Sequence, residues 1–145
     1  MRSLNQNKSI YSLDSTTLIH AVFKRASDHR ECLNIINRAA KGEINAATSL
    51  ETLEETFFIL SKLTSTSTAL RVVHDYLRIA NINKIEMTLA IFEYALEIME
   101  ITPIKRPKDA INVATMLINN ISKIISEDQE YDKVGLIQRV HPKDL

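Results

Sequence analysis

Short apolar runs alternate with longer segments of helical periodicity along most of this chain, and that alternation limits its possible folds. Strands are predicted at 9–13, 43–49, 84–88, 122–126 and 135–142. Helices are predicted at 15–25, 29–41, 50–63, 68–82, 89–101 and 108–120. Strands that alternate with helices form parallel sheets covered on both faces. We therefore expect an α/β fold, a three-layer α/β/α sandwich with a mainly parallel central sheet, in one domain over residues 1–145.

Two helices carry further local expectations. The segment at 89–101, LAIFEYALEIMEI, is apolar on most of its surface, which predicts burial between neighbours. Asp28 stands where an N-cap is expected, just before the helix at 29–41.

Composition excludes several classes of protein. The formal net charge is zero, so no overall basic field indicates nucleic acid, although a local patch remains open. The chain has two glycines, too few for a Gly-rich phosphate loop. Its single cysteine, Cys32, permits no internal disulfide and is expected in the core. The first ten residues are polar and no run reaches the ~18 apolar residues of a membrane helix, so we expect a soluble, cytoplasmic protein without a membrane partner.

Carboxylates gather where the predicted strands end or the following helices begin. Those residues are Asp14, Glu51, Glu54, Glu55, Asp109 and Asp128. In a parallel sheet these positions share one edge, which is where functional crevices form. Mg²⁺ and Mn²⁺ prefer all-oxygen ligands, and one or two such ions can activate water and stabilise an in-line phosphodiester displacement.

Each acid also has a purely structural interpretation. Asp14 or Ser15 can cap a helix, and acids in a first helical turn complement the helix dipole by ~0.3–1 kcal/mol each. Asp128 can be an ordinary turn residue. The histidines are dispersed, without HExxH or CxxC spacing, so a zinc set is not expected and each reads as a surface or core residue.

Four ordered blocks resemble the PIN-domain family, in particular the small VapC-like toxin ribonucleases. The blocks are YSLDSTTLIHAV, ATSLETLEETFFIL, RPKDAINVAT and IISEDQEYDKV. The closing GLIQRVHPKDL is similar to the family's last strand and proline. Each block is a short, loose pattern, and their order and spacing give the resemblance its strength.

The resemblance implies a metal-dependent endoribonuclease that uses Mg²⁺ or Mn²⁺ and is the toxin of a toxin–antitoxin pair. Carried over by position, the catalytic metal ligands are Asp14, Glu55, Asp109 and Asp128, with Glu51 or Glu54 as alternatives to Glu55. Ser15, Ser126 and Asp132 are supporting residues, and Lys105, Arg106 and Lys108 are candidate RNA contacts. An antitoxin partner and a homodimer are implied too, and the apolar helices at 69–80 and 88–101 are candidates for the dimer surface.

Two other functions stay open. A non-catalytic interaction module in RNA processing would keep the fold, with some acids turned away from the pocket. A receiver-like regulatory domain also places Asp and Mg²⁺ at strand ends, but the first strand lacks the paired acid that such a domain carries.

Overall fold

The computed structural model describes residues 9–145, so the polar start of the chain lies outside the described residues. Within this range five strands form one sheet in the order β3-β2-β1-β4-β5, and every neighbouring pair is parallel. The strands are β1 (Ile10–Leu13), β2 (Asn45–Ser49), β3 (Ile82–Ile85), β4 (Lys123–Ile125) and β5 (Gln138–Val140). The predicted parallel sheet is confirmed, and the last strand, β5, is also parallel to its neighbour β4.

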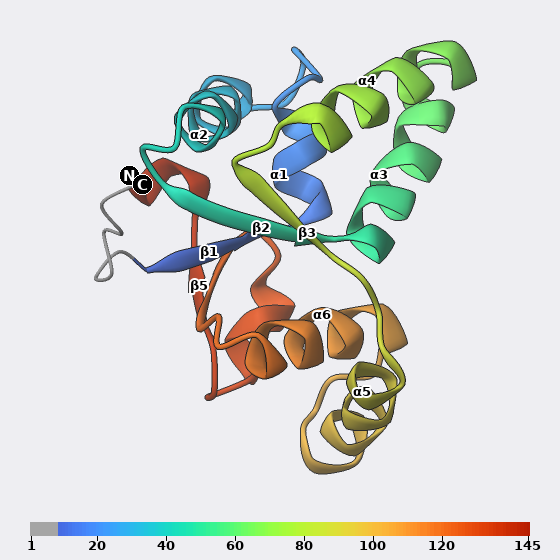
Figure 1. Cartoon of the computed structure of the whole chain (residues 1–145), viewed down its shortest axis with the longest axis vertical. Helices are drawn as coiled ribbons and strands as arrows, with labels where there is room; N and C mark the ends of the chain where they lie inside the picture. Colours follow the sequence, from blue (N-terminus) through green and yellow to red (C-terminus); the bar gives the residue numbers. More distant parts are fainter. Residues whose placement is uncertain (1–8) are drawn as a thin grey trace.

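Helices cover both faces of the sheet, as Figure 1 shows. One layer consists of α1 (Ser15–His20), α2 (His29–Ala40), α3 (Leu50–Leu63) and α4 (Thr66–Arg78). The opposite layer consists of α5 (Leu89–Ile101) and α6 (Pro107–Ile118), together with the short 3-10 helix η1 (Gln129–Lys133). A second 3-10 helix, η2 (Pro142–Asp144), closes the chain. The predicted three-layer α/β/α arrangement is therefore confirmed.

Successive strand residues point to opposite layers, which divides the core in two. Leu13, Ala46 and Ile125 pack with the layer of α1 to α4. Ala47 and Ile124 pack with α5, α6 and η1. The buried cysteine, Cys32, lies in the first of these cores, as expected. Helices thus cover both faces of the central strands, as is usual for a parallel sheet.

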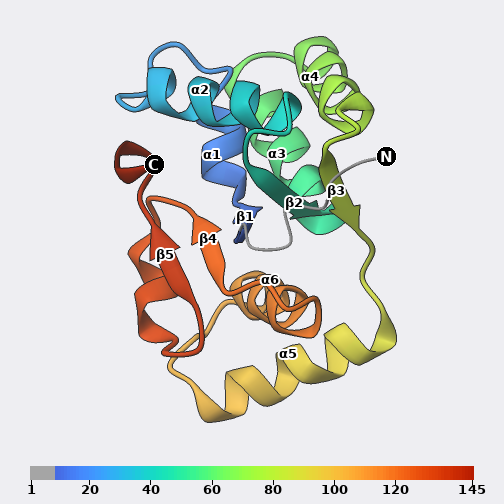
Figure 2. The same ribbon diagram turned by 60° about the vertical axis from the view of Figure 1, so that its left-hand side comes forward.

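The chain reverses direction across the sheet beside β1, as Figure 2 makes visible. From β1 it moves outward through β2 to β3, and α5 and α6 then return it to β4 on the other side of β1. A crevice at the carboxyl ends of two such strands is the usual binding position in open α/β sheets. The strand order also differs from the 2-1-3-4-5 order of receiver domains, so the receiver-like interpretation is wrong.

Several element boundaries differ from the sequence prediction. The helix predicted at 15–25 ends at His20, and turns occupy most of the segment up to α2. The loop predicted at 64–68 is shorter, because Ser65 caps α4 by accepting a hydrogen bond from the Thr68 amide. Because α4 starts and ends early, β3 begins at Ile82 rather than at residue 84.

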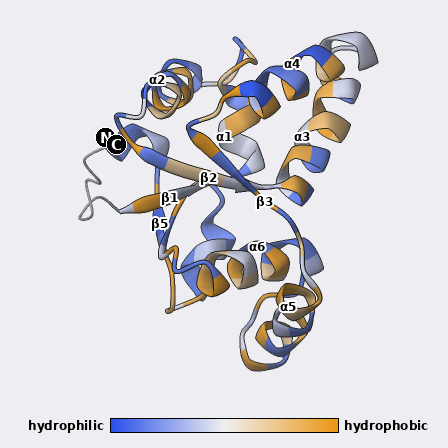
Figure 3. Ribbon diagram, in the orientation of Figure 1, coloured by the Kyte–Doolittle hydropathy of each residue, from blue (hydrophilic) through white to orange (hydrophobic). Residues whose placement is uncertain are grey.

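The apolar helix α5 is buried on one face only. Ile91, Ala95 and Ile98 pack in the core beside α6. Leu89 is 74% exposed and Leu96 is 49% exposed on the outer side. Figure 3 shows the resulting apolar colouring along α5, the outermost helix of its layer. The expected burial between neighbours is therefore wrong within residues 9–145, because apolar periodicity does not reveal whether a chain supplies a partner for each face.

None of the helices in residues 9–145 is long and apolar enough to cross a membrane.

Candidate functional site

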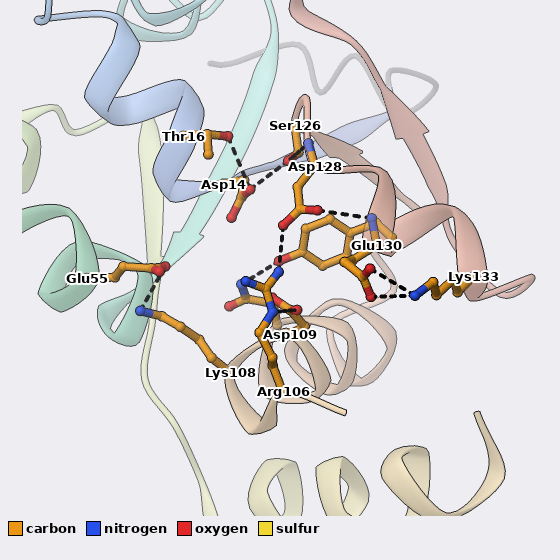
Figure 4. A network of polar contacts seen from close by, with 12 residues as sticks. Asp14, Thr16, Glu55, Arg106, Lys108, Asp109, Ser126, Asp128, Glu130 and Lys133 are labelled. Carbon is orange, nitrogen blue, oxygen red and sulfur yellow. Dashed lines mark hydrogen bonds and ion pairs between the residues drawn. The ribbon is translucent and has the colours of Figure 1, made fainter. Parts of the chain in front are cut away.

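Asp14 is held at the carboxyl end of β1 with its side chain turned toward β4. It is buried, and its amide donates to the Ile125 carbonyl at 3.3 Å. Its Oδ2 accepts hydrogen bonds from Ser126 Oγ at 2.6 Å and from Thr16 Oγ1 at 3.3 Å (Figure 4). Asp14 occupies the N-cap position of α1, but its side chain makes no capping bond. Helix capping therefore does not account for this carboxylate.

Asp128 is positioned by the turn that follows β4. Its amide donates to Ser126 Oγ at 3.0 Å, so one buried hydroxyl connects Asp128 with Asp14. Oδ1 accepts from the Glu130 amide at 3.0 Å and thereby caps η1. Oδ2 is left to accept from Arg106 Nη2 at 2.8 Å. The turn interpretation is thus correct for one oxygen, while the other oxygen faces the remaining acids (Figure 4).

Asp109 lies in the first turn of α6, which Pro107 opens as expected. Its Oδ2 accepts from Arg106 Nε at 2.8 Å. Arg106 therefore binds Asp109 and Asp128 with two different nitrogens of one guanidinium. The sequence-based assignment of Arg106 as an RNA contact did not anticipate this bridge.

Glu55 approaches the same place from α3. Its Oε2 lies 2.8 Å from Lys108 Nζ, and its charge raises the pKa of Asp14 and of Asp109. The neighbouring Glu54 is exposed. Glu51 has a buried Oε2 without a hydrogen-bond partner among residues 9–145. The contacts favour Glu55 as the member of the cluster, and Glu51 stays an alternative.

The electrostatics show four acids crowded together. Burial is the main cause that raises the pKa of Asp14, and the hydrogen bond from Ser126 opposes it. Burial also raises the pKa of Asp109 against the opposing effect of Arg106, and the charges of Asp128 and Glu55 raise it further. Like charges in a partly desolvated site repel unless cations offset them. Here Arg106 and Lys108 supply that compensation.

Beneath the acids lies a buried polar chain that sequence reasoning missed. Asn112 Nδ2 donates to the Tyr131 hydroxyl at 2.9 Å, and Asn112 Oδ1 accepts from Thr52 Oγ1 at 3.2 Å. Ser49 Oγ donates to the same Thr52 hydroxyl at 2.9 Å. Burial raises the pKa of Tyr131, and the charge of Asp14 raises it further. These hydrogen bonds connect α3, α6 and η1. Glu55 lies on α3, Asp109 lies on α6, and Asp128 caps η1.

The two remaining supporting residues, Ser15 and Asp132, lie in different places. Ser15 is buried at the start of α1, beside Asp14. Asp132 instead pairs with Arg139, whose Nε and Nη2 each lie 2.9 Å from a carboxylate oxygen. These hydrogen bonds lower the pKa of Asp132. The structure does not bring Asp132 into the acidic network.

An open, largely basic cavity adjoins the acids. It has a volume of about 680 Å³ and is lined by Pro103, Lys105, Arg106, Glu130 and Lys133. Lys133 is paired with Glu130 at 2.8 Å, whereas Lys105 is exposed at the rim. Arg106 belongs to both the acidic network and this cavity. A polyanion bound in the cavity would therefore lie next to the carboxylates.

Fold and site together define an α/β protein whose carboxylates meet at the switch point of a parallel sheet. The PIN domain model matches residues 11–136, so the chain belongs to the PIN-domain family. PIN domains are typically metal-dependent nucleases and generally use a divalent ion. No curated protein matches this sequence closely enough to count as a relative.

Solved structures of VapC toxins share the fold. VapC20 of Mycobacterium tuberculosis, described as a toxin that cleaves the sarcin–ricin loop, is 17% identical with a TM-score of 0.74, over 90% of this chain and 98% of that one. VapBC2 of Rickettsia felis, bound to a promoter DNA fragment, is 15% identical with a TM-score of 0.69, over 91% and 98%. DNA-bound VapBC of Salmonella typhimurium is 15% identical with a TM-score of 0.67, over 93% and 98%.

Proposed function

We propose that this chain is a single PIN nuclease domain that hydrolyses RNA phosphodiester bonds with Mg²⁺ or Mn²⁺, as the toxin of a toxin–antitoxin pair. The observation that carries the proposal is the convergence of Asp14, Glu55, Asp109 and Asp128 from four segments. A purely structural role for one acid would not require the other three beside it. Family membership supports the same activity.

The donor set fits a hard divalent cation. All four side chains offer carboxylate oxygens, which Mg²⁺ and Mn²⁺ prefer over nitrogen and sulfur ligands. Asp14, Glu55, Asp109 and Asp128 would hold the ion, which when bound supplies Lewis-acid stabilisation and lowers the pKa of water. Crowding among these acids is the electrostatic condition that such a cation relieves.

The chain's own residues would orient and neutralise the reacting groups. Ser126 and Thr16 fix the Asp14 carboxylate through their hydroxyls. With a metal bound, Asp109 and Asp128 would no longer need Arg106 as a partner. The Arg106 guanidinium would then be free to bind an RNA phosphate in the adjacent cavity. Lys105 and Lys108 are further candidates for phosphate contacts. Such contacts bind the RNA backbone without reading its sequence.

Partners and location belong to the same proposal. The VapBC structures that share this fold contain toxin and antitoxin together, which supports an antitoxin partner for this chain. A homodimer would cover the apolar side chains on the outer side of α5, and exposed leucines on α4 offer a second candidate surface. RNA as substrate is consistent with a cytoplasmic protein.

The alternative is a non-catalytic PIN-fold interaction module. Arg106 and Lys108 already satisfy Asp109, Asp128 and Glu55 without a metal, and a binding module would retain such a self-neutralised site. The two functions differ in whether a divalent ion displaces these cations and whether RNA is cut.

The experiment is cleavage of labelled RNA of several classes with Mg²⁺ or Mn²⁺. Wild type should cut, and Asp14→Asn should lose the cutting while staying folded, because it keeps the side-chain size but removes the charge. Glu55→Gln should lower the rate by at least about 100-fold, since several kcal/mol of charge stabilisation depend on the ligands. Glu54→Gln, one residue away and exposed, is the matched control.

Each outcome separates the alternatives. Equal cutting by wild type and Asp14→Asn would contradict the assignment of the acidic site. A wild type that binds RNA but does not cut any of the RNAs would favour the interaction module. A loss in Glu51→Gln instead of Glu55→Gln would reassign the second acid.

A further inference from the structure

A second group of metal-ligating side chains lies outside the acidic network. It consists of His20 at the end of α1 together with Asp28 and Cys32 at the start of α2. One ligand atom from each lies within 4.8 Å of the others. Asp28 and Cys32 are four residues apart, so they share a helix face, and the turn after α1 brings His20 to it. The dispersed spacing of the histidines concealed this group.

The Asp28 carboxylate is in an environment that calls for a partner. Asp28 is 1% exposed, and it occupies the N-cap position of α2 without making a side-chain capping bond. Oδ1 accepts a hydrogen bond from His20 Nδ1 at 2.6 Å. Oδ2 is buried and has no hydrogen-bond partner among the described residues 9–145. A buried carboxylate oxygen without a partner costs stability, so its retention points to a ligand.

A fourth side chain, Glu127 in the turn after β4, lies beside this group. Glu127 Oε1 lies 3.5 Å from His20 Nδ1. Burial raises the pKa of the Cys32 thiol, and the charges of Asp28 and Glu127 raise it further, so this thiol keeps its proton in the metal-free protein. Glu127 lies between Ser126 and Asp128, so the end of this strand is followed by two adjacent acids. The Glu127 side chain is 36% exposed, whereas Cys32 is fully buried. The group is therefore buried at Asp28 and Cys32 and reaches solvent at Glu127.

We propose that His20, Asp28, Cys32 and Glu127 bind one Zn²⁺ ion. Imidazole, thiolate and carboxylate are the ligands of protein zinc sites, with bonds of about 2.0–2.3 Å. Tetrahedral bonds of that length place ligand atoms roughly 3.3–3.8 Å apart, so the distances among His20, Asp28 and Cys32 need to change by only about 1 Å. Glu127 lies outside that group of three, so its side chain has to move toward it to become the fourth ligand. Zinc would replace the proton between His20 and Asp28 and the thiol proton of Cys32, both released to solvent, and would coordinate the Asp28 oxygen that now lacks a hydrogen-bond partner among the described residues.

This zinc site differs in chemistry from the acidic site. A thiolate and an imidazole select zinc over Mg²⁺ or Mn²⁺, which prefer the all-carboxylate set. Bound zinc would connect the end of α1, the start of α2 and the turn after β4. Asp14 begins α1 and Asp128 follows Glu127, so the zinc would brace two segments that carry the acidic site. We therefore assign it a structural role.

Cobalt substitution tests the site on the intact chain. Co²⁺ bound to a thiolate produces a charge-transfer band in the near ultraviolet. Cys32 is the only cysteine of the chain, so this band can arise from no other residue. We expect one equivalent of Co²⁺ to give the band and one equivalent of Zn²⁺ to abolish it, while excess Mg²⁺ leaves it unchanged. Folded wild type without the band would overturn the proposal.

Variants identify the other ligands. Cys32→Ser should remove the band, and His20→Asn and Asp28→Asn should each weaken Co²⁺ binding by at least about 10-fold, the scale at which even outer ligands act. His74→Asn, an exposed histidine on α4, is the control and should bind like wild type. A band of unchanged affinity in both His20→Asn and Asp28→Asn would overturn the proposed ligand set.

Thermal unfolding supplies a readout independent of colour. Zinc should raise the melting temperature of wild type, because a ligand that binds only the folded state stabilises it by mass action. The rise should be absent in Cys32→Ser, whose thiol-to-hydroxyl change is small enough to preserve the fold. An equal rise in both proteins would place the zinc elsewhere and contradict the proposal. RNA cleavage is not measured, so this test is independent of the proposed function.

Discussion

Ser126 Oγ donates a 2.6 Å hydrogen bond to Asp14 Oδ2 and accepts one from the Asp128 amide at 3.0 Å. Asp14 and Ser126 are 112 residues apart in sequence, yet they meet because β1 and β4 are parallel neighbours. Ser126 is fully buried, so water does not replace it. One hydroxyl thus fixes the relative position of two acids of the site.

Ser126→Ala should therefore destabilise the protein. The substitution leaves Asp14 Oδ2 without its shortest hydrogen bond and the Asp128 amide without its acceptor, at a cost of about 1–3 kcal/mol for such buried groups. Urea unfolding of the metal-free protein measures the change. Ser61→Ala is the matched control, because the exposed Ser61 hydroxyl donates only to the Phe58 carbonyl within α3. Equal losses in both variants would contradict a special role for Ser126.

Asp14→Asn should stabilise the metal-free protein at neutral pH. Burial raises the folded-state pKa of Asp14 above its ordinary value of 3.8. The folded protein therefore binds more protons than the unfolded chain as pH rises from 3.8 to that folded pKa, and its free energy of unfolding falls over this interval. Asparagine removes the loss while keeping an acceptor for Ser126.

Denaturation in the presence of a chelator, across a pH series, checks this prediction. The advantage of Asp14→Asn should be greatest above the folded pKa of Asp14 and should disappear below pH 3.8. Asp75→Asn on α4, where the carboxylate is 66% exposed, should show no such trend. A pH-independent difference between wild type and Asp14→Asn would mean that the effect is not the titration of Asp14.

The sequence predicted that these acids would lie together, because their positions follow from topology. Asp14 and Asp128 follow strands, and Asp109 begins a helix, so a parallel sheet must bring them to one edge. The pattern did not predict which strands are neighbours. For that reason the contact between Ser126 and Asp14 emerged only in the structure. The family position of Asp132 predicted a supporting role beside these acids, and in the structure its carboxylate instead pairs with Arg139 on β5.

Contacts between side chains on different elements could not be predicted from the sequence, because they depend on how the elements pack. Periodicity identifies a buried face, but it does not identify what covers it, as α5 shows. A motif search identifies ligands at fixed spacing, but His20 reaches Asp28 and Cys32 through a turn that spacing does not encode. Arg106 was predicted as an RNA contact, and its spacing gave no sign that two of its nitrogens bind Asp109 and Asp128.

Arg106→Gln should strengthen divalent metal binding in the absence of RNA. An incoming ion must displace Arg106 from two carboxylates, and exposed ion pairs are worth ~0.2–1 kcal/mol each. Removing the competitor should lower the Kd for Mn²⁺ by about twofold to thirtyfold, the equivalent of two such pairs. Calorimetric titration measures it. Lys105→Gln removes the same charge one residue earlier, so an equal gain there would indicate a general field and not the bridge.

Charged substitutions on the outer side of α5 should dissociate the proposed homodimer. Leu89, Phe92 and Leu96 lie on one stripe and are 74%, 43% and 49% exposed. Replacing an interface anchor by glutamate desolvates a charge, and loss of such anchors costs about 2 kcal/mol or more, which is at least about 30-fold in dimer Kd. Light scattering after gel filtration, over a range of concentrations, should show Phe92→Glu with Leu96→Glu as a monomer.

Leu136→Glu supplies the control for this surface. Leu136 is 58% exposed in the segment between η1 and β5 and is not part of α5, so its substitution should leave the dimer intact. A dimer that persists in the α5 variant but dissociates when Leu70 and Leu77 of α4 are replaced by glutamate would move the interface to that helix. A wild type that is monomeric at every concentration would contradict the homodimer. The outer side of α5 would then be expected to bind a different protein, because exposed apolar stripes of this kind tend to associate.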